Sequence, residues 1–279
     1  MLIMKRAAWL LAVISITSLL IPSRALAQRV VAVVDVGGGG CVMGGTRDGK
    51  WLKSEEMGPL IRGGERYSIY DLTHRVGVKT GGKTEQPGDS CSDTYFVKDL
   101  YSSDEPVNLI GIGADWNALP RVPKVESNSS PVYRAVVSAL LRRHGIRRPD
   151  VKLTKVLRVD LDGDGKEEVL INATRVKRWE TGSITPDSNA GDYSVVLVRK
   201  VIRGKVETIL LDEEYHPKGG RQENEGPPNE YELIGAFDLN GDGRMEVIVQ
   251  GGYYEGDWKT VYAINGRRAV NLFGCGCGA

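Results

Sequence analysis

The sequence has few histidines and phenylalanines, and it lacks several short motifs that mark common enzyme classes. Only 3 His and 3 Phe occur among 279 residues, and the histidines are His74, His144 and His216. No G-x-S-x-G, H-E-x-x-H or C-x-x-C motif is present, which argues against an α/β-hydrolase, a zinc protease and a thiol redox enzyme. We therefore expect a non-catalytic protein in which the three histidines have ordinary structural roles.

A dinucleotide-binding fingerprint is also missing after the first apolar stretch. Residues 30–36 are rich in valine and run into four glycines, Gly37–Gly40. The G-x-G-x-x-G pattern fails there, because its last position falls on Val42 or Met43. We interpret this region as a strand that ends in a flexible turn.

Beyond its first residues, the chain has no apolar run long enough to span a membrane. The N-terminus carries Lys5 and Arg6, then the apolar run Ala7–Ile21, then Ala25-Leu26-Ala27. A charged start, an apolar run of about 15 residues and an A-x-A exit are typical of a secretory signal peptide. The run is short of the roughly 20 residues that a spanning helix needs. We expect residues 1–27 to be cleaved, leaving a secreted, periplasmic or cell-surface protein with no membrane span.

No surplus of basic charge is present. Removing residues 1–27 takes away Lys5, Arg6 and Arg24, which leaves 34 of the 37 basic residues against 36 acidic ones, a net charge of −2. Nucleic-acid binding relies on a basic surplus that neutralises phosphates. We therefore expect no nucleic-acid partner.

Cysteines are few but even in number. They are Cys41, Cys91, Cys275 and Cys277. In an exported chain an even count indicates two disulfides. A Cys41–Cys91 bridge is slightly favoured, but the two tail cysteines could instead reach back to Cys41 and Cys91 and tie the C-terminus to the N-terminal region. A zinc site is disfavoured because the paired C-x-x-C spacing is absent.

The first part of the chain predicts a small β-rich domain of unknown role, residues 28–127. Residues 67–72 and 75–80 suggest a hairpin, and residues 102–130, rich in Pro, Asn, Ser and Gly, suggest a boundary. One helix follows, with Ser130 before its first turn and Gly145 at its end. Its predicted buried face is formed by Val132, Val136, Ala139 and Leu140.

The rest of the chain, within residues 128–279, contains a repeat. Residues 160–170 (DLDGDGKEEVL) and 238–248 (DLNGDGRMEVI) match at an offset of 78, and GDY at 191–193 matches GDW at 256–258 at an offset of 65. Each copy, 155–212 and 232–273, predicts a strand, an acidic loop and three more strands. The predicted strands are Lys155–Asp160, Glu168–Ala173, Ser194–Lys200 and Lys205–Asp212, then Glu232–Asp238, Glu246–Gln250, Lys259–Ile264 and Arg268–Phe273.

This pattern predicts a mainly β fold with one prominent helix, two four-stranded blade-like units and a small N-terminal β region. A four-stranded unit cannot bury its apolar face alone and needs a neighbour. The two units could pack face to face as a sandwich or sit side by side like propeller blades.

The acidic loops predict two calcium ions. Oxygen-bearing side chains fall at positions 1, 3, 5 and 9 of each loop, and glycines at positions 4 and 6 permit a tight curl. Ca²⁺ takes roughly 6–8 oxygen ligands, whereas Mg²⁺ prefers to keep its waters. The side-chain ligands would be Asp160, Asp162, Asp164 and Glu168 in the first loop and Asp238, Asn240, Asp242 and Glu246 in the second. Position 7 would offer the backbone carbonyls of Lys166 and Arg244.

An EF-hand is disfavoured, because its bidentate Glu at position 12 is replaced by Ile171 and Val249 and the flanks are β-branched. The pattern D-x-[DN]-x-D-G-x-x-E followed by an aliphatic residue resembles the FG-GAP family, including the calcium loops of integrin alpha chains, and the related bacterial VCBS repeats. The resemblance implies a β-blade with a calcium-holding hairpin, in an extracytoplasmic protein that is often used for adhesion or assembly. It covers residues 155–175 and 233–252 best.

The leading hypothesis is an exported, non-catalytic calcium-binding β-repeat module in which calcium rigidifies two hairpin loops. The first loop, with four carboxylates against three, is expected to bind more tightly. One alternative is a calcium-dependent adhesion module for an extracellular protein or polysaccharide, for which Tyr253, Tyr254 and Trp258 are the candidate contact residues. A second is a hydrolase with structural calcium, although no converging carboxylate pair is visible in the sequence.

Overall fold

The computed structural model describes residues 29–88, 91, 93–102, 106, 108–220 and 227–278. Within them the protein is mainly β, as the sequence predicted. The prominent helix is α2 (Pro131–Arg143), and a short helix α1 (Ser54–Met57) leads into the 3-10 turn Gly58–Leu60. The predicted signal peptide lies outside the described residues. In the described part of the chain, no helix has the length and apolar character needed to cross a membrane.

The N-terminal region forms one eight-stranded sheet with the order β5-β4-β8-β1-β2-β7-β6, and β3 pairs with β2. The predicted hairpin at residues 67–80 is confirmed, because β4 and β5 pair antiparallel. The strands are β1 (Val30–Asp35), β2 (Cys41–Arg47), β3 (Lys50–Lys53), β4 (Arg66–Tyr70), β5 (Arg75–Thr80), β6 (Thr84–Glu85), β7 (Phe96–Val97) and β8 (Ile110–Ile112).

Each copy of the repeat forms four consecutive antiparallel strands, as predicted. The second sheet has the order β13-β12-β11-β10-β9, and the third has the order β14-β15-β16-β17. The strands of the second sheet are β9 (Lys124–Val125), β10 (Leu153–Val159), β11 (Glu168–Arg175), β12 (Asp192–Ile202) and β13 (Lys205–His216). Those of the third are β14 (Glu230–Phe237), β15 (Glu246–Tyr253), β16 (Gly256–Asn265) and β17 (Arg268–Gly278).

The alternation of side chains along the second sheet assigns its two faces. Leu157, Leu170 and Val198 lie in one row across three strands and enter the largest hydrophobic core, which also contains residues of the third sheet. The neighbouring row, with Val156 and Ile171, joins a separate core beneath α2. One face therefore packs on the third sheet and the other on the helix, because successive residues of a strand point to opposite faces.

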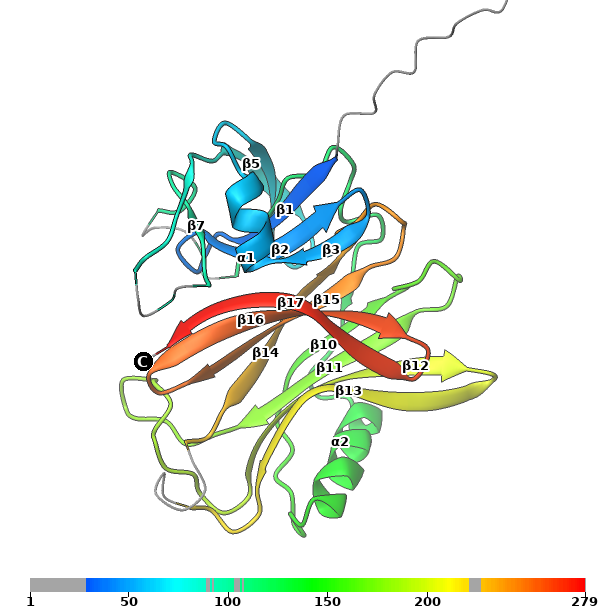
Figure 1. Ribbon diagram of the computed structural model, residues 1–279. Helices are drawn as coiled ribbons and strands as arrows, with labels where there is room; N and C mark the ends of the chain where they lie inside the picture. Colours follow the sequence, from blue (N-terminus) through cyan, green and yellow to red (C-terminus); the bar gives the residue numbers. More distant parts are fainter. Residues whose placement is uncertain are drawn as a thin grey trace, which may run out of the picture.

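The third sheet is buried on both faces. Tyr262 of β16 faces the second sheet and donates a hydrogen bond from its hydroxyl to Asp212 Oδ1 of β13, at 3.0 Å. On the opposite face, Phe273 packs against Trp51 of β3, with ring centroids 5.6 Å apart. The molecule is thus a stack of four layers in the order N-terminal sheet, β14–β17, β9–β13 and α2 (Figure 1). Of the two arrangements open from the sequence, the two repeat units adopt face-to-face packing.

The disulfide pairing differs from the one that the sequence favoured. Cys41 of β2 is bonded to Cys275 of β17, with Cα atoms 6.4 Å apart, so the Cys41–Cys91 pairing is wrong. The layers explain this, because β17 lies against β2 and carries Cys275 on the face that meets the N-terminal sheet. Cys91 is also disulfide-bonded, and the side chain of Cys277 lies outside the described residues. The alternative in which the tail reaches back to the N-terminal region holds for Cys41.

The turn predicted at Gly37–Gly40 is present, and it is short because β2 begins at Cys41. This strand was missed because Gly44 and Gly45 interrupt its apolar pattern. A Cβ atom on Gly44 would lie 2.7 Å from the Phe273 ring. The glycine therefore permits the close approach of β17 that the layered packing requires.

Helix α2 occupies the predicted residues but is rotated relative to the prediction. Of the predicted face only Leu140 is buried, and Val132 is 67 % exposed. The face that packs on the second sheet contains Val137, Leu140 and Leu141, with Tyr133 partly buried beside them. This stripe is displaced by one residue, about 100° around the helix axis, because the sheet beneath sets which side of the helix is covered.

Candidate metal centre

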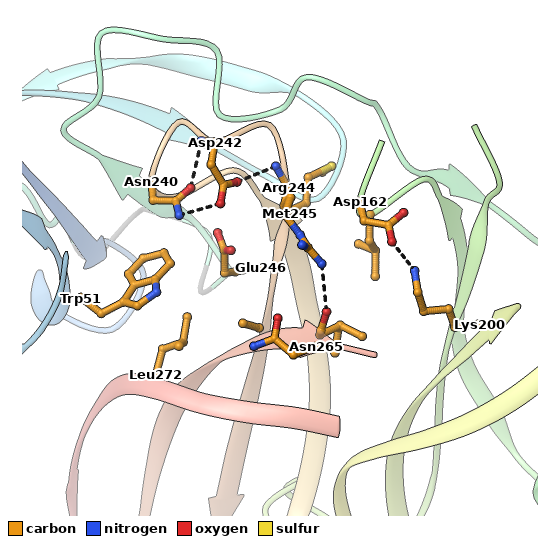
Figure 2. A pocket seen from close by; sticks show the side chains of 13 residues that line it. Trp51, Asp162, Lys200, Asn240, Asp242, Arg244, Met245, Glu246, Asn265 and Leu272 are labelled. Atoms are coloured by element: carbon orange, nitrogen blue, oxygen red, sulfur yellow. Dashed lines mark hydrogen bonds and ion pairs between the residues drawn. The ribbon is translucent and has the colours of Figure 1, made fainter. Parts of the chain in front are cut away.

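The two acidic loops lie side by side, although 78 residues separate them in the chain. Each connects the first two strands of its unit, so the face-to-face packing of the two sheets brings them to the same edge. The amide of Met245 donates to the carbonyl of Leu161 at 2.8 Å and joins the loops directly. Residues from both, including Asp162, Asp242 and Glu246, line a pocket of about 270 Å³ (Figure 2).

Both loops are held by the same hydrogen bonds to the Asp at position 1. The Asp160 carboxylate accepts from the amides of Gly163 and Gly165 at 2.8 and 3.0 Å. Asp238 accepts from the glycines at the same positions of its own loop, at 2.7 and 3.0 Å. Gly163 and Gly165 have φ of 75° and 83°, which explains why glycine is needed there. The repeated motif is therefore a repeated structure.

The Glu at position 9 also has the same role in each loop. Glu168 Oε2 accepts from the amide of Leu161 at 2.8 Å, and Glu246 Oε2 accepts from the amide of Leu239 at 3.0 Å. Both glutamates are buried, and each begins the second strand of its hairpin. Each glutamate therefore closes its loop from beneath and leaves its other carboxylate oxygen available to a cation.

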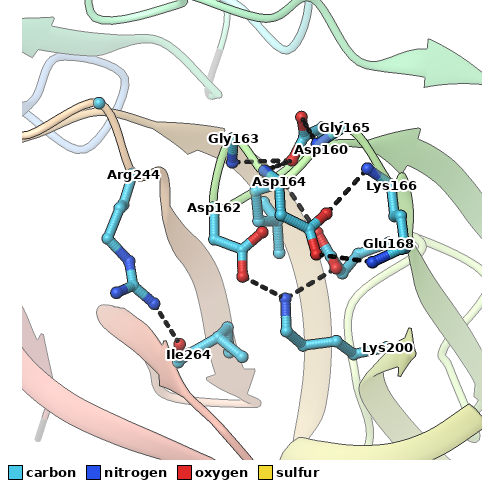
Figure 3. A network of polar contacts seen from close by, with 12 residues as sticks. Asp160, Asp162, Gly163, Asp164, Gly165, Lys166, Glu168, Lys200, Arg244 and Ile264 are labelled. Atoms are coloured by element: carbon cyan, nitrogen blue, oxygen red, sulfur yellow. Dashed lines mark hydrogen bonds and ion pairs between the residues drawn. The ribbon is translucent and has the colours of Figure 1, made fainter. Parts of the chain in front are cut away.

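In the first loop, the second carboxylate oxygen of Glu168 accepts a hydrogen bond from a lysine (Figure 3). Lys200 Nζ donates to Glu168 Oε1 at 2.8 Å and to Asp162 Oδ2 at 2.7 Å. Burial alone would lower the pKa of Lys200, but these two hydrogen bonds and charges raise its pKa above the ordinary value. Oxygens of Asp160, Asp162 and Glu168 all lie within 4.8 Å of one another. Among the described residues this is the only group of three such side chains that converges so closely.

The corresponding glutamate of the second loop is Glu246, and within the described part of the chain it has no cationic partner. Glu246 is 4 % exposed and points into the pocket (Figure 2). No lysine, arginine or histidine of the described residues forms an ion pair with it. Desolvation, with smaller contributions from the charges of Asp242 and Asp238, raises the pKa of Glu246 to about 8. A cation bound here would therefore stabilise a buried carboxylate that otherwise lacks a counter-charge.

Positions 5 and 7 form the same hydrogen bond in both loops, whereas position 3 has different partners. Asp164 and Asp242 accept from the backbone amides of Lys166 and Arg244, both at 2.8 Å. The Asn240 amide group donates to Asp242 Oδ2 at 3.0 Å. The backbone amide of Lys166 is the main cause of the lowered pKa of Asp164. The role predicted for the carbonyls of residues 166 and 244 remains a prediction.

One arginine from the predicted boundary stretch binds both loops. Arg121 donates to the carbonyls of Asp160 and Leu161 in the first loop, and to that of Gly243 in the second at 2.6 Å. Trp116, from the same stretch, donates to the carbonyl of Asp238 at 2.9 Å. Trp116 and Arg121 therefore fix this stretch against the two loops.

Sequence reasoning missed Lys200 and Arg121, and only Lys200 carried a local signal. Lys200 follows Val196 and Val198 in the alternation of β12, and both valines point into the core. A lysine in that phase is directed inward and requires a buried counter-charge. Arg121 lies in a Pro-rich segment without periodicity, and its contacts depend on tertiary packing alone.

The aromatic residues singled out for adhesion are brought together, but away from the acidic loops. Tyr253 contacts Tyr254 and Trp258, with ring centroids 5.6 and 6.4 Å apart. Both tyrosines line a second pocket, of about 380 Å³. They lie at the end of β15 opposite Glu246, where the acidic loop enters that strand.

The N-terminal sheet also contains a sequence that matches a nucleotide-binding motif. Residues 77–84 (GVKTGGKT) match the P-loop pattern G-x-x-x-x-G-K-T. They form the end of β5, a short connection and the start of β6, with no helix behind the loop. The amide of Gly82 donates to the carbonyl of Lys98 at 2.7 Å. A phosphate-binding loop needs free backbone amides and the N-terminus of a helix. Residues 77–84 therefore match the sequence pattern without forming a phosphate-binding loop.

Comparison with protein-family models, with curated proteins and with solved structures finds no match to this chain.

Proposed function

We propose that this protein is an exported, non-catalytic β-repeat protein that binds Ca²⁺ in its paired acidic loops, and that calcium rigidifies the edge where the two repeat units meet. The observation that carries the proposal is the repeated loop geometry. Two loops share the same hydrogen bonds at positions 1 and 9, and Asp162 of the first loop lines one pocket with Asp242 and Glu246 of the second. Hard oxygen donors held by a glycine-curled backbone suit Ca²⁺ better than a softer metal.

A structural role suits the position of the loops. Leu161 and Met245 join them directly, and Arg121 binds the backbone of both. An ion that fixes one loop therefore also restrains the other and the segment that carries Arg121. Such coupling favours stabilisation by calcium over catalysis by calcium.

Export is part of the proposal. It is supported by the signal-like N-terminus and by the disulfide between Cys41 and Cys275, because disulfides persist mainly outside the reducing cytosol. Membership of the FG-GAP or VCBS repeats is proposed on the loop pattern and on the four-stranded units that carry it.

The test is to strip the purified protein of divalent ions and titrate it with calcium. Calorimetry measures the heat of binding, and the melting temperature measures the stabilisation. A ligand at 100 times its dissociation constant stabilises the folded state by about 2.7 kcal/mol, which shifts the melting temperature by several degrees. Mg²⁺ at the same concentration should have a much smaller effect.

Two variants locate the effect. Asp242→Asn removes an acidic side chain of the second loop and should weaken calcium binding. Glu255→Gln changes an exposed carboxylate in the β15–β16 turn and should leave binding unchanged. No heat and no thermal shift at millimolar calcium would contradict the proposal.

The aromatic pocket supports a second candidate function, the binding of a polysaccharide. Tyr253 and Tyr254 line it together with Glu230, Gln250 and Asp257. Aromatic faces next to carboxylates and amides suit the apolar faces and hydroxyls of sugars. Because this pocket lies at the opposite end of β15 from the acidic loop, we expect such binding to be independent of calcium. Loss of glycan binding in Tyr254→Ala, at equal stability, would identify the pocket as the site.

A further inference from the structure

The two acidic loops share their backbone geometry but differ in what faces their carboxylates. We infer that the ammonium group of Lys200 serves as the permanent cation of the first loop, and that the second loop alone takes up Ca²⁺. This inference rests on the proposed calcium binding, and it names which of the two loops performs it. It reverses the expectation from the sequence that the first loop binds more tightly.

The contacts of Lys200 carry the inference. Its Nζ lies 2.7 Å from Asp162 Oδ2 and 2.8 Å from Glu168 Oε1, the side chains at positions 3 and 9 of the loop. The residue is 8 % exposed, so its charge is removed from water as well as paired. Figure 3 shows the ammonium group between the two carboxylates, on the inner side of the loop. It therefore occupies the position toward which inward-pointing loop oxygens would direct a metal ion.

The register of the strands shows what stands at this position in the second copy. Val169 pairs with Arg199, so Lys200 is opposite Glu168. In the second unit Val247 pairs with Tyr262, so Ala263 is opposite Glu246. The offset of 65 between the GDY and GDW segments would make Asn265 the equivalent of Lys200. The strand registers instead make Ala263 its equivalent, at an offset of 63. The methyl group of Ala263 cannot supply a charge.

A second difference between the loops accompanies this one. Position 3 is Asp162 in the first loop and Asn240 in the second. At positions 1, 3, 5 and 9 the first loop has four carboxyl groups and the second loop has three, and a lysine contacts two of the four in the first loop. The additional acid and the additional lysine contact each other, so they form one charge-balanced pair that the second loop lacks.

Displacing Lys200 would be costly. A Ca²⁺ ion in the first loop must break both ion pairs and leave a buried ammonium without a partner, and removing one partner of a buried pair is strongly destabilising. In the second loop no such exchange is required, because Glu246 is buried without a cationic partner among the described residues. The affinity of the first loop for calcium is therefore far below that of the second.

The test counts bound Ca²⁺ ions by calorimetry on metal-stripped protein. The natural sequence should bind one ion. Lys200→Met keeps the aliphatic stem and removes the charge, and it should bind two. Ala263→Lys places an ammonium opposite Glu246 and should bind none. Lys205→Met, at an exposed lysine that begins β13, is the matched control and should bind one.

The outcomes separate this inference from the function on which it rests. Two ions in the natural protein would overturn the inference and leave calcium binding intact. No ion in the natural protein and none in Lys200→Met would overturn both. If Lys200→Met does not fold, Ala263→Lys still decides, because retention of one ion in that variant would overturn the assignment to the second loop.

Discussion

Lys259 and Asp35 form a buried ion pair that joins the third sheet, β14–β17, to the N-terminal sheet. Lys259 Nζ lies 2.6 Å from Asp35 Oδ2, and the two side chains are 2 % and 6 % exposed. Asp35 pairs with Cys41 across β1 and β2, and Lys259 pairs with Cys275 across β16 and β17. The ion pair and the Cys41–Cys275 disulfide therefore connect two neighbouring residues of one sheet to two neighbouring residues of the other.

Replacing Lys259 with methionine should destabilise the protein by about 3–5 kcal/mol, because it leaves the charge of Asp35 buried without a partner. Burial already raises the pKa of Asp35, although Lys259 opposes that shift. The double variant Asp35→Asn/Lys259→Met should regain most of the loss, and a double-mutant cycle in urea measures this coupling. Lys98→Met, which breaks an exposed pair with Glu85, should change little. Equal losses in the single and double variants would contradict the argument.

Arg121→Ala should loosen both acidic loops at once, because the side chain binds carbonyls of Asp160, Leu161 and Gly243. Each hydrogen bond to a charged group contributes about 1.5–3 kcal/mol to stability. The carbonyls that lose their partner in this variant add a further cost. Hydrogen exchange should show faster exchange of loop amides in both hairpins. Arg268→Ala, at an exposed arginine of β17, is the control. Faster exchange in the first loop alone would show that the arginine does not couple the two.

Much of this arrangement follows from the sequence, and the parts that do not have identifiable causes. The repeat strands were predictable because β-branched residues alternate there and because the acidic motif fixes where each hairpin turns. β8 has three residues and β9 has two, too few for any periodicity. The Cys41–Cys275 pairing depends on how the sheets stack, which no local pattern encodes. The alternation of β12 indicates that Lys200 points inward, but its partners can be identified only from the pairing of β12 with β11.

Asp212→Asn should stabilise the protein near neutral pH. Burial raises the pKa of Asp212 above its ordinary value, with the Tyr262 hydroxyl opposing the shift. A carboxyl group with a raised folded-state pKa contributes stability below its unfolded pKa of about 3.9, and that contribution is lost as pH rises through the folded value. Asparagine keeps an oxygen that can accept from Tyr262 and carries no charge.

The melting temperature of Asp212→Asn should therefore match that of the natural protein near about pH 3 and exceed it near about pH 7. Glu55→Gln, at an exposed residue of α1, should show no such divergence. A lower melting temperature of Asp212→Asn at neutral pH would mean that the charge of Asp212 contributes to the contact between the two repeat sheets.

The rotation of α2 can be tested with two valines on different sides of the helix. Val137 is fully buried against the second sheet, whereas Val132 is 67 % exposed. Truncating a buried valine removes apolar contact worth about 1.5–3 kcal/mol, so Val137→Ala should lower the free energy of unfolding by that order. Val132→Ala should change it little, since alanine is also the better helix former. The sequence pattern, which placed Val132 on the buried face, predicts the opposite ranking, and a urea titration of the two variants decides between them.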